Sequence, residues 1–163
     1  MTAWAARPVE IRNLFNPAFC GLLQATAIRS FEQEDKSGLP FSLSLLVLPL
    51  CLHESTRQVL NEHDRAYLLK LVADHPGLRV GLASRVRQML PFTFEAQGLL
   101  HRYGALTVAD GGRLKVPPRK VSSSFEPGSD EVRACLQAAR FLGRQLGRIG
   151  DPVTVYASVG LKP

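Results

Sequence analysis

Cys51, His53 and Glu54 come nearest to a chemical site in this sequence of 163 residues. A thiol, an imidazole and a carboxylate so close together have the chemistry of a metal ligand set or of a nucleophile with its base. No other ligand follows at a known metal-site spacing, and the remaining cysteines, Cys20 and Cys135, stand far away in apolar surroundings. The pattern therefore favours buried thiols and a surface histidine over a metal or catalytic site.

Other features that enzymes use are also missing from the sequence. The glycines around Gly111 lack the Gly-Lys-Ser/Thr ending of a phosphate-binding loop. Gly143 to Gly150 lie within or at the end of an expected helix that no strand precedes. We therefore expect a protein without enzyme activity, cofactor or metal.

A polar helix face is the next candidate for function. Thr93, Gln97 and His101 recur every four residues, so a helix places them on one side, within reach of base edges or a partner protein. A plain solvated surface has the same pattern. The face also carries little charge, because Arg102, a further candidate contact, is offset by Glu95.

The positive charge of the chain is concentrated in one segment. The formal net charge is +6, and residues 75–120 hold 8 basic and 2 acidic side chains. This distribution is expected of a surface that meets a polyanion such as DNA, and equally of a solvated basic face that keeps a protein soluble. The candidate contacts in and after the expected hairpin are Arg113, Lys115, Arg119 and Lys120.

The first part of the chain is expected to be helical. Asn16 and Pro17 are a typical N-cap and first helical residue, and this helix should end within the glycine-ended stretch 32–38. Serines alternate with apolar residues at the start of 40–53, as in a strand. The length and leucine content of this stretch favour instead a buried helix that bends or ends near Pro49.

The middle of the chain has the order of a winged helix-turn-helix. Apolar positions recur at helical spacing in three successive segments: 64–75, 78–89 and 92–103. Two β-prone runs around Asp110-Gly111-Gly112 then predict a hairpin, the wing. We expect a mainly α fold with a small β-hairpin, in which a winged helix-turn-helix-like core is embedded in a larger helical domain.

The last part of the chain is expected to contain a linker and a long helix. Residues 118–129 are rich in Pro, Ser and Gly, and Asp130 caps a helix whose apolar stripe runs to Ile149. After it, the Asp151-Pro152 cap favours a helix and the β-branched residues that follow favour a strand. We expect one domain over 1–163, divided into a helical part (1–60), a winged-helix-like part (62–117), a flexible linker (118–129) and a C-terminal helix with a terminal element (130–163).

The sequence shows neither a signal peptide nor an apolar run long enough to span a membrane. We therefore expect a cytoplasmic protein with no membrane partner.

The phrase RPVEIRNLFNPAFC at residues 7–20 resembles the middle component of three-component ABC systems. These are small bacterial proteins encoded between an ABC ATPase of the SMC/Rad50 type and a variable effector. The apolar block 40–53, Thr56-Arg57 and the phrase FLGR at 141–144 extend the resemblance over nearly the whole chain. The residues that carry it are Arg7, Pro8, Glu10, Asn13, Asn16, Pro17, Phe19, Arg57 and Arg144.

The resemblance implies an adaptor that couples the nucleotide-dependent state of the ATPase to the effector in an antiphage or conflict system. It implies no catalytic residues, and the expected partners are the ATPase and the effector. The motif also has a simpler interpretation, in which Arg7 and Glu10 form an ion pair and Asn13 and Asn16 cap helices. The alternative function is a winged-helix transcriptional regulator that binds DNA.

Overall fold

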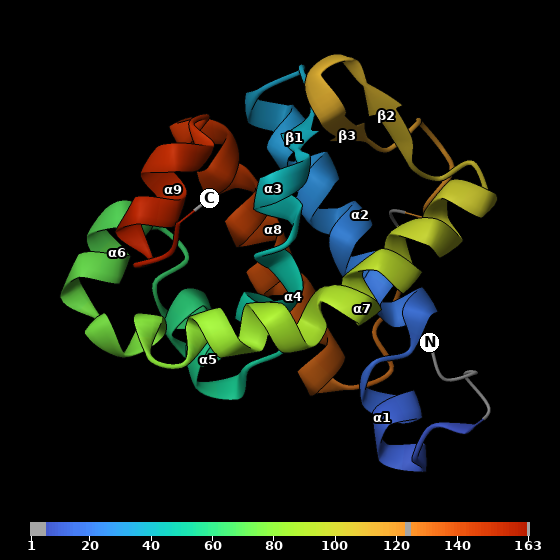
Figure 1. Ribbon diagram of the computed structural model, residues 1–163, viewed down its shortest axis with the longest axis horizontal. Coiled ribbons are helices and arrows are strands. Elements are labelled where there is room, and N and C mark those ends of the chain that lie inside the picture. Colours follow the sequence, from blue (N-terminus) through green and yellow to red (C-terminus); the bar gives the residue numbers. More distant parts are fainter. Residues whose placement is uncertain (1–5, 123–124, 163) are drawn as a thin grey trace.

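The computed structural model describes residues 6–122 and 125–162. This part of the chain is mainly helical, with one small antiparallel sheet (Figure 1). The α-helices are α1 (Val9–Leu14), α2 (Pro17–Glu34), α3 (Phe41–Ser44), α4 (Val47–Cys51), α5 (Glu54–Glu62), α6 (Leu68–Asp74), α7 (Leu82–Arg102), α8 (Asp130–Ile149) and α9 (Pro152–Ser158). The strands are β1 (Leu39–Pro40), β2 (Thr107–Ala109) and β3 (Arg113–Lys115).

Helix α2 begins where the sequence predicts. The Asn16 side chain accepts a hydrogen bond from the Ala18 backbone N–H at 2.8 Å, and Pro17 fills the first helical position. A proline costs nothing there, because its missing N–H would have no partner within the helix. The helix is buried along most of its length, which places it in the core.

Helix α8 lies beside α2 in the middle of the molecule (Figure 1). Its predicted apolar stripe faces the core, with Cys135, Leu142 and Leu146 buried. The cap differs from the prediction by one residue, because the Ser129 side chain accepts the Val132 N–H.

Glycines bring α8 against the backbone of α2. A Cβ on Gly143 would lie 2.7 Å from Ser30 Cβ and closer still to the Ala27 carbonyl oxygen. One turn further along, a Cβ on Gly147 would lie 2.9 Å from the Phe31 carbonyl oxygen. Because contacts advance in the same direction along both helices, α2 and α8 run parallel.

The apolar stretch 40–53 is helical but divided. Helices α3 and α4 are separated at residues 45–46, and β1 precedes them. Pro49 does not end α4, because it occupies the third helical position, where the backbone N–H has no acceptor within the helix. The expectation of a buried helix holds for α4, in which every residue is buried.

The segment 78–103 differs from the prediction. Helix α7 runs unbroken through Pro91, and a 3-10 turn, η2 (Pro76–Arg79), separates it from α6. Pro91 has no N–H to donate to the Arg87 carbonyl, but both residues are exposed, so water can replace that bond. The two helices expected to meet at Pro91 are therefore one, and the winged-helix core is not confirmed.

The predicted hairpin forms and gains a third strand. Strands β2 and β3 pair antiparallel, with Val108 opposite Leu114, across the turn η3 (Asp110–Gly112). β1 pairs with the other edge of β3, with Leu39 opposite Leu114. Gly38 permits this approach, because its φ is +96° and a Cβ there would lie 2.8 Å from the Leu114 carbonyl oxygen.

The terminal element is a helix, α9. Asp151 accepts hydrogen bonds from the Val153 and Thr154 N–H groups, so the cap decides against the strand alternative. Burial of Val155 and Tyr156 holds α9 on the core, and the Tyr156 hydroxyl donates to the Ser42 carbonyl at 2.7 Å. In the described part of 118–129 there is no helix or strand.

A methyl group at Gly143 should destabilise the protein. We expect Gly143→Ala to lower the free energy of unfolding by about 1–3 kcal/mol, because α2 and α8 must separate to admit it. Gly98→Ala is the matched control, because a Cβ there meets nothing within 4 Å and alanine favours helix by up to about 1 kcal/mol. Urea unfolding measures both, and equal stability of the two variants would contradict the close packing.

Candidate functional site

A hollow of about 460 Å³ lies at the N-terminal ends of the parallel helices α2 and α8. We call it the aromatic groove. Its residues come from the start of α2, the end of α4, α5, the middle of α7, the segment before α8 and the start of α8. They are Phe15, Asn16, Phe19, Leu52, Arg57, Met89, Phe125, Gly128, Glu131, Val132 and Cys135.

The N-terminal segment is fixed against α7 beside this groove. The rings of Phe15 and Phe92 stack with centroids 4.3 Å apart and an angle of 18°. The guanidinium of Arg7 lies 5.6 Å from the centre of the Phe92 ring and forms a two-pronged ion pair with Glu95, with Nη1 2.8 Å from Oε2. Stacking and a bidentate pair each favour one geometry, so together they set the position of Phe15.

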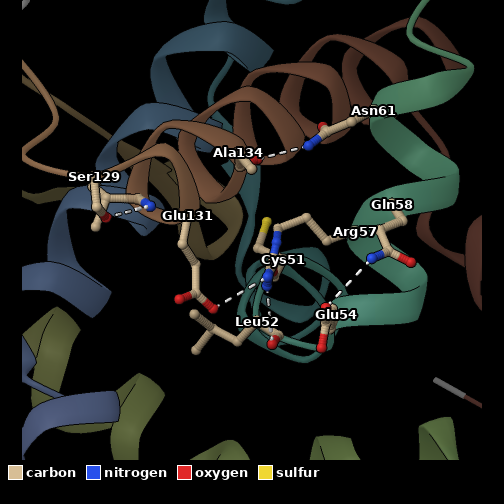
Figure 2. A network of polar contacts seen from close by, with 10 residues as sticks. Cys51, Leu52, Glu54, Arg57, Gln58, Asn61, Ser129, Glu131 and Ala134 are labelled. Atoms are coloured by element: carbon tan, nitrogen blue, oxygen red, sulfur yellow. Dashed lines mark hydrogen bonds and ion pairs between the residues drawn. The ribbon is translucent and has the colours of Figure 1, made fainter.

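Arg57 supports the floor of the groove from α5. Its side chain is 8% exposed, and Nη1 donates to the carbonyls of Cys51 and Leu52, both at 3.2 Å. These carbonyls end α4 and have no partner within that helix. Nη2 reaches Glu131 at 3.3 Å, so one cation joins α4, α5 and α8 (Figure 2).

A further polar contact lies next to Arg57. The Asn61 side chain donates to the Ala134 carbonyl at 3.0 Å and so ties α5 to α8, as Figure 2 shows. The Glu131 side chain is 76% exposed at the rim of the groove, although one oxygen contacts Arg57. The groove thus has apolar walls and an accessible carboxylate at its edge.

The thiols lack the character of nucleophiles. Burial raises the pKa of Cys20 to about 12 and also raises the pKa values of Cys51 and Cys135. Burial, together with the charges of Arg85 and Arg57, lowers the pKa of His53. At neutral pH the thiols therefore stay protonated and the imidazole is uncharged.

Both ring nitrogens of His53 contact neighbouring side chains. Its Nδ1 lies 2.9 Å from the Thr56 hydroxyl, and its Nε2 accepts a hydrogen bond of 3.4 Å from Arg85. In the described part of the chain, no three His, Cys, Asp or Glu side chains are placed to hold a metal ion.

The helix face predicted to reach DNA or a partner is partly buried, so the prediction is wrong for Thr93 and Gln97. Thr93 is 1% exposed and Gln97 8%, and the Gln97 amide donates to the Ser44 hydroxyl at 2.9 Å. Together with Ala96 and Leu100 they form the buried stripe of α7. His101 is exposed, and its Nδ1 lies 3.3 Å from the Leu106 carbonyl oxygen.

The predicted basic contacts in and around the hairpin fall into two groups. Arg113 donates to the Ser37 hydroxyl at 2.8 Å and to the Gly38 carbonyl at 2.9 Å, so it fastens β3 to the loop after α2. It also lies 3.7 Å from Asp35, whose pKa is lowered mainly by hydrogen bonds from Ser37. Four cations make no ion pair with any described residue: Arg102, Lys115, Arg119 and Lys120.

A comparison with models of protein families finds a match over residues 4–163. The model describes the ABC-three component (ABC-3C) system Middle Component 3. The chain belongs to this family. Comparisons with curated proteins and with solved structures give no match for this Middle Component 3 chain.

The motif residues of this Middle Component 3 chain lie in several places. Asn16, Phe19 and Arg57 meet at the aromatic groove, while Pro17 borders a shallow hollow with Glu95 and Arg102. Arg144 lines a separate pocket between α2 and α8. Pro8 caps α1, and the side chains of Glu10 and Asn13 lie outside what the structure describes.

Of the groove residues, the sequence singled out only Asn16, Phe19 and Arg57. It missed the others as contacts: Phe15, Leu52, Met89, Phe125, Gly128, Glu131, Val132 and Cys135. The sequence could have pointed to Phe125, because it is the one aromatic residue in a stretch otherwise rich in Pro, Ser and Gly. Across the described residues of this Middle Component 3 chain, none of the helices is long and apolar enough to cross a membrane.

Loss of the Arg57 guanidinium should destabilise this region. We expect Arg57→Met to lower the free energy of unfolding by about 1–3 kcal/mol, because the buried Cys51 carbonyl and the part-buried Leu52 carbonyl lose their donor. The control is Glu131→Gln, which keeps an acceptor at an exposed site and should change stability by less than about 0.5 kcal/mol. Chemical denaturation tests both variants, and a neutral Arg57→Met would contradict the role of Arg57.

Proposed function

We propose that this protein is a non-enzymatic adaptor that links an SMC/Rad50-like ABC ATPase to an effector in a bacterial antiphage system. Membership in the Middle Component 3 family supports a place between other components. The resemblance of residues 7–20 supports the ATPase and effector as partners. The proposal needs a surface that recognises another protein, and the aromatic groove is the best candidate.

The aromatic groove has the form of a pocket for an anchoring side chain. Its volume of about 460 Å³ lies within the range of about 300–1,000 Å³ that is typical of binding pockets. Phe15 and Phe19 provide apolar walls, and the Phe125 side chain is 46% exposed at its edge. Large apolar anchors in such pockets carry much of the energy of protein association.

The rim of the groove indicates the chemistry of the partner. Glu131 presents a largely exposed carboxylate next to the apolar walls. A matching segment places an apolar side chain in the groove and a Lys or Arg beside Glu131. We assign this segment to the ABC ATPase. Because the Arg57 contacts and the Phe15–Phe92 stack hold the walls in place, binding costs little ordering of the groove.

Reversal of the rim charge should weaken capture of the ATPase. We expect Glu131→Lys to reduce the affinity by about tenfold or more, because a cation then faces the partner's basic side chain. Met89→Ala, which enlarges the groove, should act in the same direction. Co-expression with the ATPase and effector encoded nearby, followed by affinity purification, measures the effect.

Glu126→Lys is the matched control for this experiment, because Glu126 is exposed and does not line the groove. Its affinity should stay within about twofold of wild type. Equal loss in Glu126→Lys and Glu131→Lys would refute the groove as the docking site. A wild-type chain that purifies without either component would refute the adaptor.

The alternative function, a DNA-binding regulator, has one observation in its favour. The four cations near the hairpin make no ion pair with described residues, so they are available to phosphates. Burial of Thr93 and Gln97 opposes it, because these side chains cannot read bases.

DNA binding through the hairpin end would be strongly salt dependent. If it occurs, Arg119→Glu with Lys120→Glu should reduce affinity for duplex DNA about tenfold or more and flatten the salt dependence. Lys162→Glu, near the other end of the described chain, should have a smaller effect. Fluorescence anisotropy at low and moderate salt tests this, and absence of binding at low salt would eliminate the alternative.

A further inference from the structure

A cavity of about 200 Å³ lies between α2 and α8, and residues 121, 122 and 125 complete its wall. We call it the arginine pocket, because Arg29 of α2 and Arg140 and Arg144 of α8 line it. Arg29 and Arg144 are half-buried, and Arg140 is exposed. The pocket is separate from the aromatic groove except for Phe125, which borders both.

No described acidic side chain forms an ion pair with the arginines of the arginine pocket. The described lining of this pocket contains no carboxylate. Two other arginines on the same helix do have acidic partners: Arg133 contacts Asp130, and Arg148 lies 3.3 Å from Glu34. Like charges gathered in a concave site raise the local potential and favour an anion.

Hydrogen-bonding groups accompany the charge. The Ser30 side chain lines the pocket, and its hydroxyl makes no hydrogen bond with a described residue. The hydroxyl can therefore donate to a ligand in the pocket. Gln33 adds an amide at the same pocket.

The backbone holds these groups in place. Arg140 and Arg144 are four residues apart and therefore lie on one face of α8. The contact of Gly143 with Ala27 and Ser30 fixes this face relative to Arg29 on α2. The three arginines that line the pocket therefore stand on two helices that are packed closely against each other.

The residue types identify the ligand chemistry. Arginine binds phosphate through paired N–H groups in a planar fork, with more directionality than lysine. Leu22, Val121 and Phe125 give one wall an apolar character that suits a flat organic group. We propose that the arginine pocket binds the phosphate group of a small ligand, either free phosphate or the phosphate of a mononucleotide. This proposal does not rest on the adaptor role.

Isothermal titration of the full-length chain tests the proposal, with inorganic phosphate and adenosine monophosphate as probes at constant ionic strength. We expect at least one probe to bind, and Arg144→Gln to weaken that binding by about tenfold or more. Arg140→Gln should do the same and is exposed, so it leaves the core intact. Arg133→Gln is the control on the same helix and should change the affinity by less than about twofold.

Phe125→Ala separates the two sources of phosphate. If the ligand is a mononucleotide, this variant weakens binding of adenosine monophosphate but not of inorganic phosphate; if it is free phosphate, neither changes. Thermal unfolding adds a second readout, because a bound ligand raises the melting temperature of wild type but not of Arg144→Gln. Failure of both probes to bind at about 10 mM, or equal weakening by Arg133→Gln, would overturn the proposal.

Discussion

The close approach of α2 to α8 is the constraint on which the other contacts depend. Gly143 and Gly147 remove the side chains that would separate the two backbones, and the resulting pair runs parallel through the core. The sheet is attached to α2 through Arg113 and through Glu32, which accepts the Val116 N–H. At other positions along α2 and α8, where both helices carry larger side chains, hollows remain beside the pair.

The two cavities follow from the register of this pair. The aromatic groove contains the first turns of both helices, and the arginine pocket contains residues one to several turns further along. The Gly143 contact with Ala27 and Ser30 lies within the span of the arginine pocket, and the Gly147 contact follows one turn later. Arg57 then adds a polar junction, because its single cation satisfies the end of α4 and contacts α8. A change in the spacing of α2 and α8 therefore affects both sites.

Local signals explain what the sequence predicted correctly. Asn16-Pro17 and Asp151-Pro152 each fix a helix start through hydrogen bonds within three residues, and the hairpin depends on the glycines between its strands. The apolar stripe of α8 is long enough to define its buried face. These features need no information from distant parts of the chain, which is why one sequence suffices to find them.

Contacts between distant parts of the chain explain what the sequence did not predict. Pro91 normally suggests a helix end, and α7 continues through it because that position faces water. The buried stripe of α7 includes Gln97, whose amide donates to Ser44 of α3, far away in the sequence. β1 has two residues and exists through its pairing with β3, and the partner of Arg7 that the structure describes, Glu95, lies 88 positions away. The groove likewise joins segments that no spacing rule connects.

The shared position of Phe125 has a thermodynamic consequence. Its ring borders both the aromatic groove and the arginine pocket, so a ligand that displaces it on one side alters the wall of the other. Two sites that share a wall residue become energetically coupled when a ligand in one of them moves that residue, and the coupling is then the same in both directions. A ligand in the proposed arginine pocket that moved the Phe125 ring would change affinity at the groove, and a partner in the groove that moved it would change affinity at the pocket by the same factor.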